Sequence, residues 1–438
     1  MTSTFSTPGD FEKKPTSGRE RDVDRDDLED LLGVLSAGTE RPPEQYMCDG
    51  VSPIMAARPS SVSELAEILL VANQRNLAVM PQGGRTALTL GRPLTHYDLA
   101  LDTTALNRVL DYAPEDLTIT VEAGITLKLL QESLAEQGQY LPIDPPPGDQ
   151  VTIGGLLATA RSGAWRGHLP AARDLILGAT VASPDGSLTR SGGRVVKNVS
   201  GYDMHRMHTG ALGTLGVIVE ASFKLSPLPA AVSSFAIVCS SLSRAGTVAC
   251  EIWDRNLATR AITILDSKTS AILDCGDVAT VLVEFAASES VVVRSEETLR
   301  EILRDYDMSA EHIGNDIWAQ IRSLTHRDGI DTVIRAGVPA SEVSGFIDHM
   351  EIIDGPSWGH VAAGSVWSCP NVNAQTLLGL RVVAERLGGF LQLESGSKSL
   401  REVVDPFGVS DAGLTDSLKS QFDPRSTLNP GKWKAVST

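Results

Sequence analysis

One stretch of the chain decides the fold: Asp144-Pro-Pro-Pro-Gly-Asp-Gln-Val-Thr-Ile-Gly-Gly-Leu-Leu-Ala-Thr-Ala-Arg-Ser-Gly163. Its three consecutive prolines fix φ and carry no amide donor, so this part of the backbone is stiff. Gly154, Gly155 and Gly163 permit dihedral angles and close approaches that a Cβ atom would forbid. The combination is typical of a backbone segment that lies against a bound ligand.

Two further glycine-rich stretches flank the first one. Upstream, Val79-Met-Pro-Gln-Gly-Gly-Arg-Thr-Ala-Leu88 runs from an apolar strand end into a loop. Successive amides in such a loop can form an anion-binding concavity for a diphosphate. Alone, the Gly-Gly pair favours an ordinary turn, but the neighbouring stretches reverse that preference.

The downstream stretch is Gly210-Ala-Leu-Gly-Thr-Leu-Gly-Val-Ile-Val-Glu220. Its glycines are spaced G-x-x-G-x-x-G, and a β-type run follows the last of them. A Rossmann dinucleotide site requires G-x-G-x-x-G between a strand and a helix. We therefore interpret this stretch as a turn into a strand and reject a Rossmann fold.

The bulk composition is that of a soluble globular protein with more than one domain. The chain has 438 residues, 42% of them hydrophobic and 21% charged, so two or three domains are expected. A net charge of -17 and the lack of a dense basic stripe argue against nucleic acid but leave a small anionic substrate possible. The cysteines are scattered without a C-x-x-C pair and predict neither disulfides nor an iron-sulfur ligand set: Cys48, Cys239, Cys250, Cys275 and Cys369.

The N-terminal segment carries no pattern of a signal peptide, and no stretch is long and apolar enough to span a membrane. Residues 1–25 mix Ser, Thr, Pro and alternating charges, which predicts a mobile tail. We expect a cytoplasmic protein that can associate with a membrane through its partners.

Periodic patterns predict alternating helices and strands along the chain. Apolar residues at helical spacing predict helices at 60–73, 126–137, 244–256 and 296–306. Alternating or continuous apolar runs predict strands at 77–80, 98–102, 118–122, 175–183, 216–225, 235–239, 261–265 and 280–285.

The three glycine stretches, in this order and spacing, resemble the FAD-binding domain of the vanillyl-alcohol oxidase superfamily, also called the p-cresol methylhydroxylase type. The resemblance implies an α+β fold with a two-lobed FAD-binding domain at 50–229, its lobes at about 50–122 and 123–229. A C-terminal α+β cap or substrate domain at 230–438 follows. Phe422-Asp-Pro-Arg-Ser-Thr-Leu-Asn-Pro-Gly-Lys432 resembles the closing segment of the superfamily, which returns to the FAD lobe.

The resemblance also implies the residues that bind FAD. They are Gln82, Gly83, Gly84, Arg85, Thr86, Pro145, Pro146, Thr152, Gly154, Gly155, Ser162, Gly163, Gly216, Val217 and Ile218. Some members of the superfamily carry a histidine in the first glycine loop that links covalently to the flavin. This chain has none there, so non-covalent FAD is expected.

A cluster of polar residues precedes the third glycine stretch. The segment from Lys197 to Asp203 resembles a Lys-Asn-x-x-Gly-Tyr-Asp pattern of flavin-linked 2-hydroxyacid dehydrogenases. A cationic group here could hold a substrate carboxylate or stabilise reduced flavin, and a structural role for Lys197 and Tyr202 is equally compatible. His205 and His208 lack an acidic third ligand at helical spacing, so we do not predict a metal pair.

The segment Trp358-Gly-His-Val-Ala-Ala-Gly-Ser-Val-Trp367 resembles the Gly-His-x-Gly-Asp-Gly-Asn-x-His segment with which catalytic 2-hydroxyacid dehydrogenases bind metal and substrate. His360 and Gly364 match. The acid, amide and second histidine are replaced by Ala363, Ser365 and Trp367, which cannot supply the converging donors that a metal needs. We therefore predict no metal site.

Two other family positions differ as well. Leu393-Glu-Ser-Gly-Ser-Lys398 lacks the histidine of the family's Glu-His-Gly segment, and Leu212 stands where catalytic chains carry an acid. The resemblance then implies the FAD-binding subunit of a glycolate oxidase complex, with a homologous catalytic flavin subunit and an iron-sulfur subunit as partners. Two alternatives stay open, a stand-alone FAD-dependent 2-hydroxyacid dehydrogenase and a non-catalytic flavoprotein scaffold of a redox complex. No catalytic base is predicted.

Overall fold

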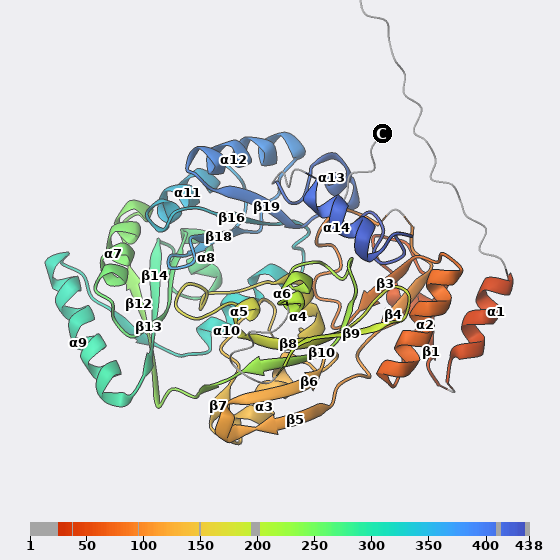
Figure 1. Cartoon of the computed structure of the whole chain (residues 1–438). Helices are drawn as coiled ribbons and strands as arrows, with labels where there is room; N and C mark the ends of the chain where they lie inside the picture. The colour runs from red at the N-terminus through yellow and green to blue at the C-terminus, as the bar shows by residue number, and fades with distance from the viewer. Residues whose placement is uncertain are drawn as a thin grey trace, which may run out of the picture.

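The computed structural model of the chain describes residues 25–36, 38–94, 96–148, 150–193, 202–408 and 413–433. Three main sheets organise these residues, with four strands, five strands and eight strands. In Figure 1 the four-stranded sheet lies at the right, the five-stranded sheet at the bottom and the eight-stranded sheet at the upper left. Lys197 and nearly all of the predicted tail at 1–25 lie outside the described residues.

The first lobe contains the four-stranded sheet, with strand order β1-β2-β4-β3. β2, β4 and β3 are parallel, and β1 pairs antiparallel with β2. α2 begins where the Ser61 side chain accepts a hydrogen bond from the amide of Glu64, and its apolar face packs on the sheet. The elements are α1 (Arg25–Val34), β1 (Glu40–Arg41), η1 (Pro43–Tyr46), β2 (Met55–Ala57), α2 (Val62–Gln74), β3 (Val79–Gln82) and β4 (Leu99–Asp102).

The second lobe contains the antiparallel five-stranded sheet β5-β6-β10-β8-β9. β10 joins the cores of both lobes, because Val217 and Val219 pack into the first core and Ile218 and Phe223 into the second. The elements are β5 (Val109–Ala113), η2 (Pro114–Asp116), β6 (Thr118–Glu122), α3 (Leu127–Ala135), β7 (Gln139–Tyr140), α4 (Ile153–Thr159), α5 (Ala172–Leu175), β8 (Ile176–Ala182), β9 (Leu188–Gly192), α6 (Met204–His208), β10 (Val217–Lys224) and β11 (Ser226–Pro227).

Strand pairing places the boundary between the lobes earlier than the sequence indicated. The strand predicted at 118–122 is β6, and it pairs with β10 instead of with the strands of the first lobe. By this criterion the boundary falls between Asp102 and Val109, not at residue 122. The alternation of apolar residues predicts that a strand forms but not which strand becomes its partner.

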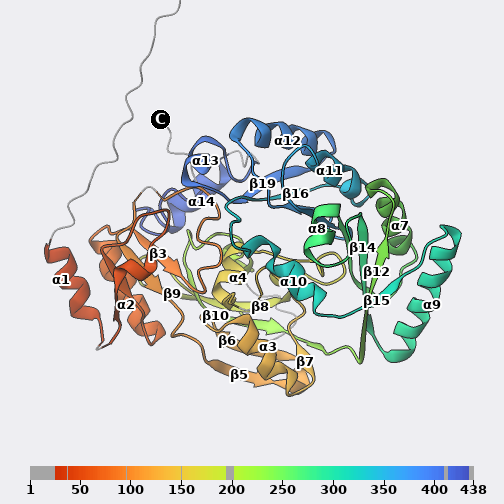
Figure 2. The ribbon, with the colours of Figure 1, turned by 180° about the vertical axis from the view of Figure 1, so that it is seen from behind.

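The cap contains the antiparallel eight-stranded sheet β15-β12-β14-β13-β17-β18-β16-β19. Helices α7, α9, α11 and α12 cover its outer face, whereas α8 and α10 lie on the side of the FAD lobes (Figures 1 and 2). The elements are β12 (Ala231–Val238), α7 (Leu242–Asp254), β13 (Thr259–Leu265), α8 (Ser267–Ile272), β14 (Thr280–Ala287), α9 (Glu289–Asp305), β15 (Glu311–Ile313), α10 (Ile317–Ser323), η3 (Leu324–His326), β16 (Val333–Gly337), η4 (Ala340–Glu342), α11 (Val343–Met350), β17 (Ser357–His360), β18 (Ser365–Ser368), α12 (Ala374–Arg386), β19 (Phe390–Ser395), α13 (Lys398–Val403) and α14 (Leu414–Phe422).

Each predicted helix and strand has a counterpart in the structure, with one notable shift. The helix predicted at 296–306 begins at Glu289, two turns earlier. Three consecutive valines, 291–293, occupy its start, and β-branched residues disfavour a helix locally. Burial of Val292 in the cap core overrides that preference.

The C-terminal segment returns to the first lobe, as the resemblance implied. The amide of Val79 donates to the carbonyl of Thr427 at 2.8 Å, and the amide of Asn429 donates to the carbonyl of Val79 at 2.9 Å. Lys419 on α14 donates to the carbonyl of Thr214 at 2.8 Å and pairs with Asp423 at 2.6 Å. The segment therefore extends the first sheet beyond β3.

We expect Asp423→Ala to detach this segment. The Asp423 carboxylate is fully buried and accepts from the amides of Thr427 and Leu428 at 3.0 and 2.7 Å. Its removal leaves these two amides without their acceptor and the Lys419 ammonium without its only carboxylate partner among the described residues, so the free energy of unfolding in urea should fall by about 3 kcal/mol. The control Asp354→Ala removes an exposed partner of Lys268. It should change the free energy of unfolding by less than about 1 kcal/mol. Equal effects of the two variants would contradict the anchoring role.

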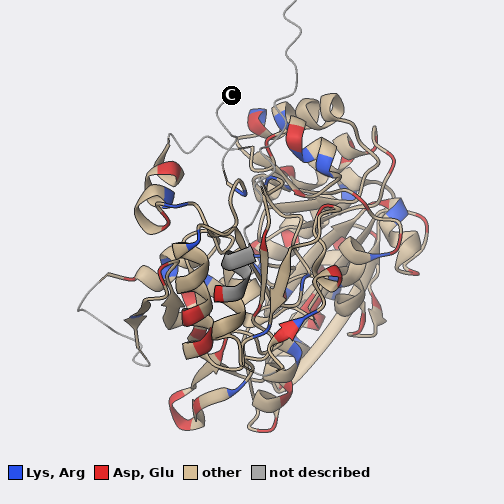
Figure 3. Cartoon of the chain, turned by 90° about the vertical axis from the view of Figure 1, so that its right-hand side faces the viewer, with Lys and Arg blue, Asp and Glu red and all other residues tan. Residues whose placement is uncertain are grey.

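The described surface mixes both signs of charge. Lys and Arg alternate with Asp and Glu in Figure 3, and no continuous basic stripe is visible on the described residues in this view. Among the helices of the described residues, none is long and apolar enough to cross a membrane.

Candidate FAD site and the interface cavity

The first glycine loop and the proline stretch line one cavity between the two lobes. Eight of the fifteen predicted cofactor-binding residues surround it: Gly83, Gly84, Arg85, Thr86, Pro145, Pro146, Thr152 and Gly155. The C-terminal segment completes the wall with Asn429 and Lys432. Segments far apart in the sequence thus meet at the place where a diphosphate was expected.

The glycines serve loop packing as well as ligand approach. A Cβ atom on Gly84 would lie 1.7 Å from the carbonyl oxygen of Gln150, and one on Gly83 would lie 2.1 Å from Thr152 Oγ1. These two glycines let the loops that line the cavity touch. Gly155 differs, because only Thr152 Oγ1, at 3.2 Å, lies near its Cβ position, which leaves an open side toward the cavity.

The other predicted residues lie outside this cavity. Ser162 lines a neighbouring cavity, and Gly154 packs against Ala123. Gln82 is buried and donates to the hydroxyl of Tyr97 at 2.5 Å.

The remaining predicted residues pack against other parts of the protein. Gly163 packs against Asp144, and Gly216 packs against Val181. The side chains of Val217 and Ile218 lie in the cores. A role of any of these residues in FAD binding stays a prediction.

Asp144, the first residue of the proline stretch, is linked to the cap through hydrogen bonds of Trp165. The carboxylate of Asp144 accepts from the amides of Gly163 and Trp165 at 3.2 and 3.1 Å. Burial raises the pKa of Asp144 to about 7, although these amides oppose the shift. The indole of Trp165 donates to Glu284 at 3.0 Å and lies under the guanidinium of Arg260. This chain of contacts couples the FAD lobe to β13 and β14.

A second cavity of about 650 Å³ lies between the FAD lobes and the cap. It shares Leu90, Thr159, Arg161 and Leu212 with the first cavity. From the cap it is lined by Arg335, Gln392, Glu394 and Phe407, among others. Ligand sites favour such domain interfaces, and the shared wall lets one ligand contact both cavities.

A buried charge cluster forms part of the wall of this interface cavity. Glu394 accepts from Arg161 at 3.0 Å and from Arg335 at 2.7 Å. Burial alone would raise the pKa of Glu394, but the charges and hydrogen bonds of Arg335 and Arg161 outweigh it and lower that pKa. Two guanidinium groups share one carboxylate, so the three side chains carry a net charge of about +1 at neutral pH.

Four residues around the two cavities have a strained backbone. Arg85, Ala160, Leu212 and Asn429 have φ of 57°, 51°, 52° and 46°. A residue with a Cβ atom pays roughly 1 kcal/mol or more for this region. These positions mark tight turns in the cavity wall, as Ala160 does where α4 ends.

The segment that resembles the family's metal-binding segment is packed into the cap. His360 is buried, and its Nδ1 lies 2.9 Å from the hydroxyl of Thr263. Burial lowers the pKa of His360 to about 3, so the ring is neutral. Trp367 is buried at the position of the family's second histidine. Within the described ranges, no group of three or more His, Cys, Asp and Glu side chains is arranged to hold a metal ion.

The polar cluster before the third glycine stretch does not reach the cavities as far as it is described. Tyr202 is 89% exposed, whereas His205 and His208 are buried on α6. His205 Nδ1 lies 3.3 Å from the hydroxyl of Ser191, and burial lowers the pKa of His208 to about 4. These two imidazoles therefore place no cation at the cavities, and a role of Lys197, which lies outside the described residues, stays a prediction.

Sequence reasoning missed the residues that come from distant segments. Arg161, Arg335 and Glu394 lie far apart along the chain, and no local pattern joins them. Lys432 belongs to the closing segment whose return was expected, but its position in the cavity wall was not. His326 from the cap also reaches the glycine loop, with Nε2 3.0 Å from the carbonyl oxygen of Thr86.

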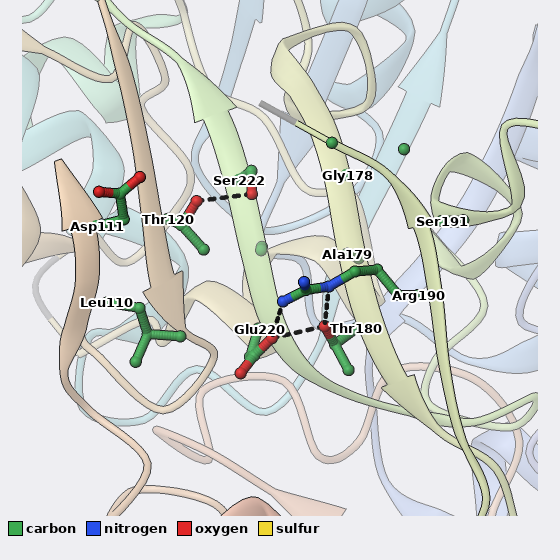
Figure 4. A pocket seen from close by; sticks show the side chains of 13 residues that line it. Leu110, Asp111, Thr120, Gly178, Ala179, Thr180, Arg190, Ser191, Glu220 and Ser222 are labelled. Carbon is green, nitrogen blue, oxygen red and sulfur yellow. Dashed lines mark hydrogen bonds and ion pairs between the residues drawn. The ribbon is translucent and has the colours of Figure 1, made fainter. Parts of the chain in front are cut away.

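A separate groove lies on the outer face of the five-stranded sheet (Figure 4). Thr180 donates to Glu220 at 2.6 Å, Arg190 pairs with Glu220 at 3.3 Å, and Thr120 and Ser222 share a hydrogen bond of 2.8 Å. These polar groups satisfy one another on an open sheet face. None of the predicted cofactor-binding residues lines the groove.

Comparison with known proteins agrees with this geometry. The family described as FAD binding domain matches residues 53–192. Glycolate oxidase subunit GlcD of Bacillus subtilis is 25% identical over 85% of this chain and 87% of its own length. Glycolate oxidase subunit GlcE of Escherichia coli is 38% identical over 34% of this chain and 43% of its own length. The solved structure of p-cresol methylhydroxylase with bound substrate superimposes with a TM-score of 0.74 at 13% identity, covering 94% of this chain and 97% of that one.

The residues at the first cavity fit FAD. Its glycine loop offers backbone amides, Gly155 has an open side, and the buried Oδ1 of Asn429 has no hydrogen-bond partner among the described residues. Gly83 to Thr86, Thr152 and Gly155 are the groups that would hold the cofactor. The FAD binding domain and the relatives support an FAD-dependent oxidoreductase. Residues 53–192 match the FAD binding domain, and the chain shares the fold of p-cresol methylhydroxylase.

Proposed function

We propose that this chain is the FAD-binding subunit of a complex that oxidises glycolate to glyoxylate and passes the electrons to partner subunits. Its relatives over most of the chain include a glycolate oxidase subunit and a D-lactate dehydrogenase of Anaerostipes hadrus. These names support a 2-hydroxyacid with a CH–OH group as the substrate class. When bound, FAD supplies the two-electron acceptor for this oxidation.

One observation carries the subunit role: the cap segment that resembles the metal-binding segment lacks its donors. Ala363 and Trp367 stand in place of the family's acid and second histidine, and His360 is committed to Thr263. Glu394 is held by two arginines and is not free to bind a cation. A partner that keeps the family's metal-type histidines would complete the chemistry, and an iron-sulfur subunit would take the electrons.

A second candidate, a stand-alone 2-hydroxyacid dehydrogenase without metal, is favoured by the arginines in the interface cavity. Arg161 and Arg335 line this cavity and share one carboxylate, which leaves positive charge for a substrate carboxylate. Both guanidinium groups can bind and orient an anion beside the FAD cavity, because Arg161 lines both cavities.

Anaerobic mixing of the purified holoprotein with glycolate or D-lactate separates the two candidates. For a subunit, we expect the visible flavin absorbance to stay constant with the chain alone and to bleach with glycolate once partner subunits are added. Bleaching of the isolated chain by either acid would support the stand-alone enzyme and contradict the subunit role. A preparation that contains no flavin and cannot be loaded with FAD would overturn both.

A further inference from the structure

Lys432 is a buried cation at the wall of the FAD cavity. Lys432 is only 4% exposed, and its side-chain ammonium donates a hydrogen bond to the carbonyl of Leu88. Among the described residues, no carboxylate lies within ion-pair distance of Lys432. The cavity wall therefore contains a positive charge that the protein itself does not neutralise.

The groups around Lys432 do not supply the missing negative charge. Asp49 already accepts from the guanidinium of Arg401, which is fully buried. Burial raises the pKa of the neighbouring Cys48 thiol, which keeps it neutral. Lys432, Arg401 and Asp49 together carry a net charge of about +1 when Lys432 is protonated.

Such a charge is costly without a counter-ion. An isolated ammonium in a protein interior costs several kcal/mol and deprotonates unless an anion pairs with it. Burial, with the charge of Arg401, lowers the pKa of Lys432 to about 8, in agreement with this cost. The unpaired charge thus points to an anionic ligand at this wall.

We propose that Lys432 pairs with the diphosphate of bound FAD, and that the closing segment thereby completes the cofactor site. The diphosphate is the group that fits, because it is negative in every redox state, whereas the oxidised flavin ring is neutral. The ammonium is held by Leu88, which ends the same loop whose glycines were expected to bind the diphosphate. Asn429, also in this segment, offers its unpartnered Oδ1 to a donor of the same ligand.

The test compares wild-type protein, Lys432→Met and Lys432→Arg after removal of FAD, titrated with FAD and with ADP. Lys268→Met, which changes an exposed lysine, is the matched control. We expect Lys432→Met to bind FAD and ADP about 10- to 100-fold more weakly, as expected for loss of a charge-assisted hydrogen bond. Lys432→Arg should retain part of the affinity, and the control should match wild type.

Stability and pH give readouts that a merely structural lysine would not produce. Lys432→Met removes an uncompensated charge, so the apoprotein should unfold at the same or a higher urea concentration. FAD binding by wild type should weaken as pH rises above about 8, where the apoprotein loses the Lys432 proton, and Lys432→Met should lack this dependence. Cys48, Asp49 and Arg401 are the other charged or titratable groups at this position, and they remain in both proteins.

Two results would overturn the proposal. Unchanged ADP affinity together with a lower flavin reduction potential in Lys432→Met would place the lysine at the flavin ring instead. Unchanged affinity of Lys432→Met for FAD and ADP, together with a less stable apoprotein, would show that Lys432 only holds Leu88 in place. Failure of the wild-type protein to bind FAD is a distinct outcome, because it would contradict the cofactor assignment itself.

Discussion

Gly84→Ala is expected to remove FAD from the protein. The added Cβ would lie 1.7 Å from the carbonyl oxygen of Gln150 and 2.9 Å from its carbon, and these are backbone atoms that cannot rotate away. The two loops that line the FAD cavity must then separate. We expect the free energy of unfolding to fall by about 3 kcal/mol, at the upper end for overpacking, and purified protein to lose its visible flavin absorbance.

Gly379→Ala provides the control for this experiment. Gly379 lies within α12, and nothing lies within 4 Å of its Cβ position. The substitution should stabilise the protein by up to about 1 kcal/mol and leave FAD bound, because alanine favours a helix interior over glycine. A folded Gly84→Ala protein with wild-type FAD affinity would show that the loops do not need this contact.

Glu394→Gln is expected to have the largest effect within the interface cavity. The variant leaves Arg161 and Arg335 close together without their shared counter-charge in a largely buried place. Breaking a buried ion pair in this way costs about 3 to 5 kcal/mol, which urea unfolding at pH 7 would measure. Glu251→Gln, which removes an exposed helix pair with Arg255, should cost less than about 0.5 kcal/mol.

The stability difference between wild type and Glu394→Gln should depend on pH. The pKa of Glu394 is lowered in the folded protein, so its stabilisation is present above the unfolded pKa, about 4.3, and is lost as pH falls through the lower folded value. The stability difference between wild type and Glu394→Gln should therefore be largest near neutral pH and shrink below pH of about 4. A difference that is small at pH 7, or equally large in acid, would contradict the ionised cluster.

The segment that lacks the metal donors lies beside the interface cavity, because the guanidinium of Arg335 lies over the Trp367 ring, 5.7 Å from its centre. At residues 360–367 the sequence keeps the frame of the family's segment but not its donors, and the structure buries His360 and Trp367 in the cap. Arg161 and Arg335 lie nearby in the cavity wall and can orient an acid without a metal.

Local sequence determined the elements and the loops of this protein. Helical and strand periodicity predicted α2, α3, β8 and β10 within a few residues, because side-chain spacing reports the period of the local backbone. The glycine and proline patterns indicated the loops that line the FAD cavity. They did so because the close contacts at Gly83 and Gly84 leave no room for a Cβ atom, which excludes every other residue type there.

Only the tertiary structure decided which distant groups meet. Arg161 and Glu394 are separated by 233 positions, and Lys432 reaches the cavity only because the closing segment pairs with Val79. The partner of β6 and the start of α9 were likewise set by core packing, not by local preference. Electrostatic pairing and strand pairing depend on distances in space, and a single sequence without its fold does not contain those distances.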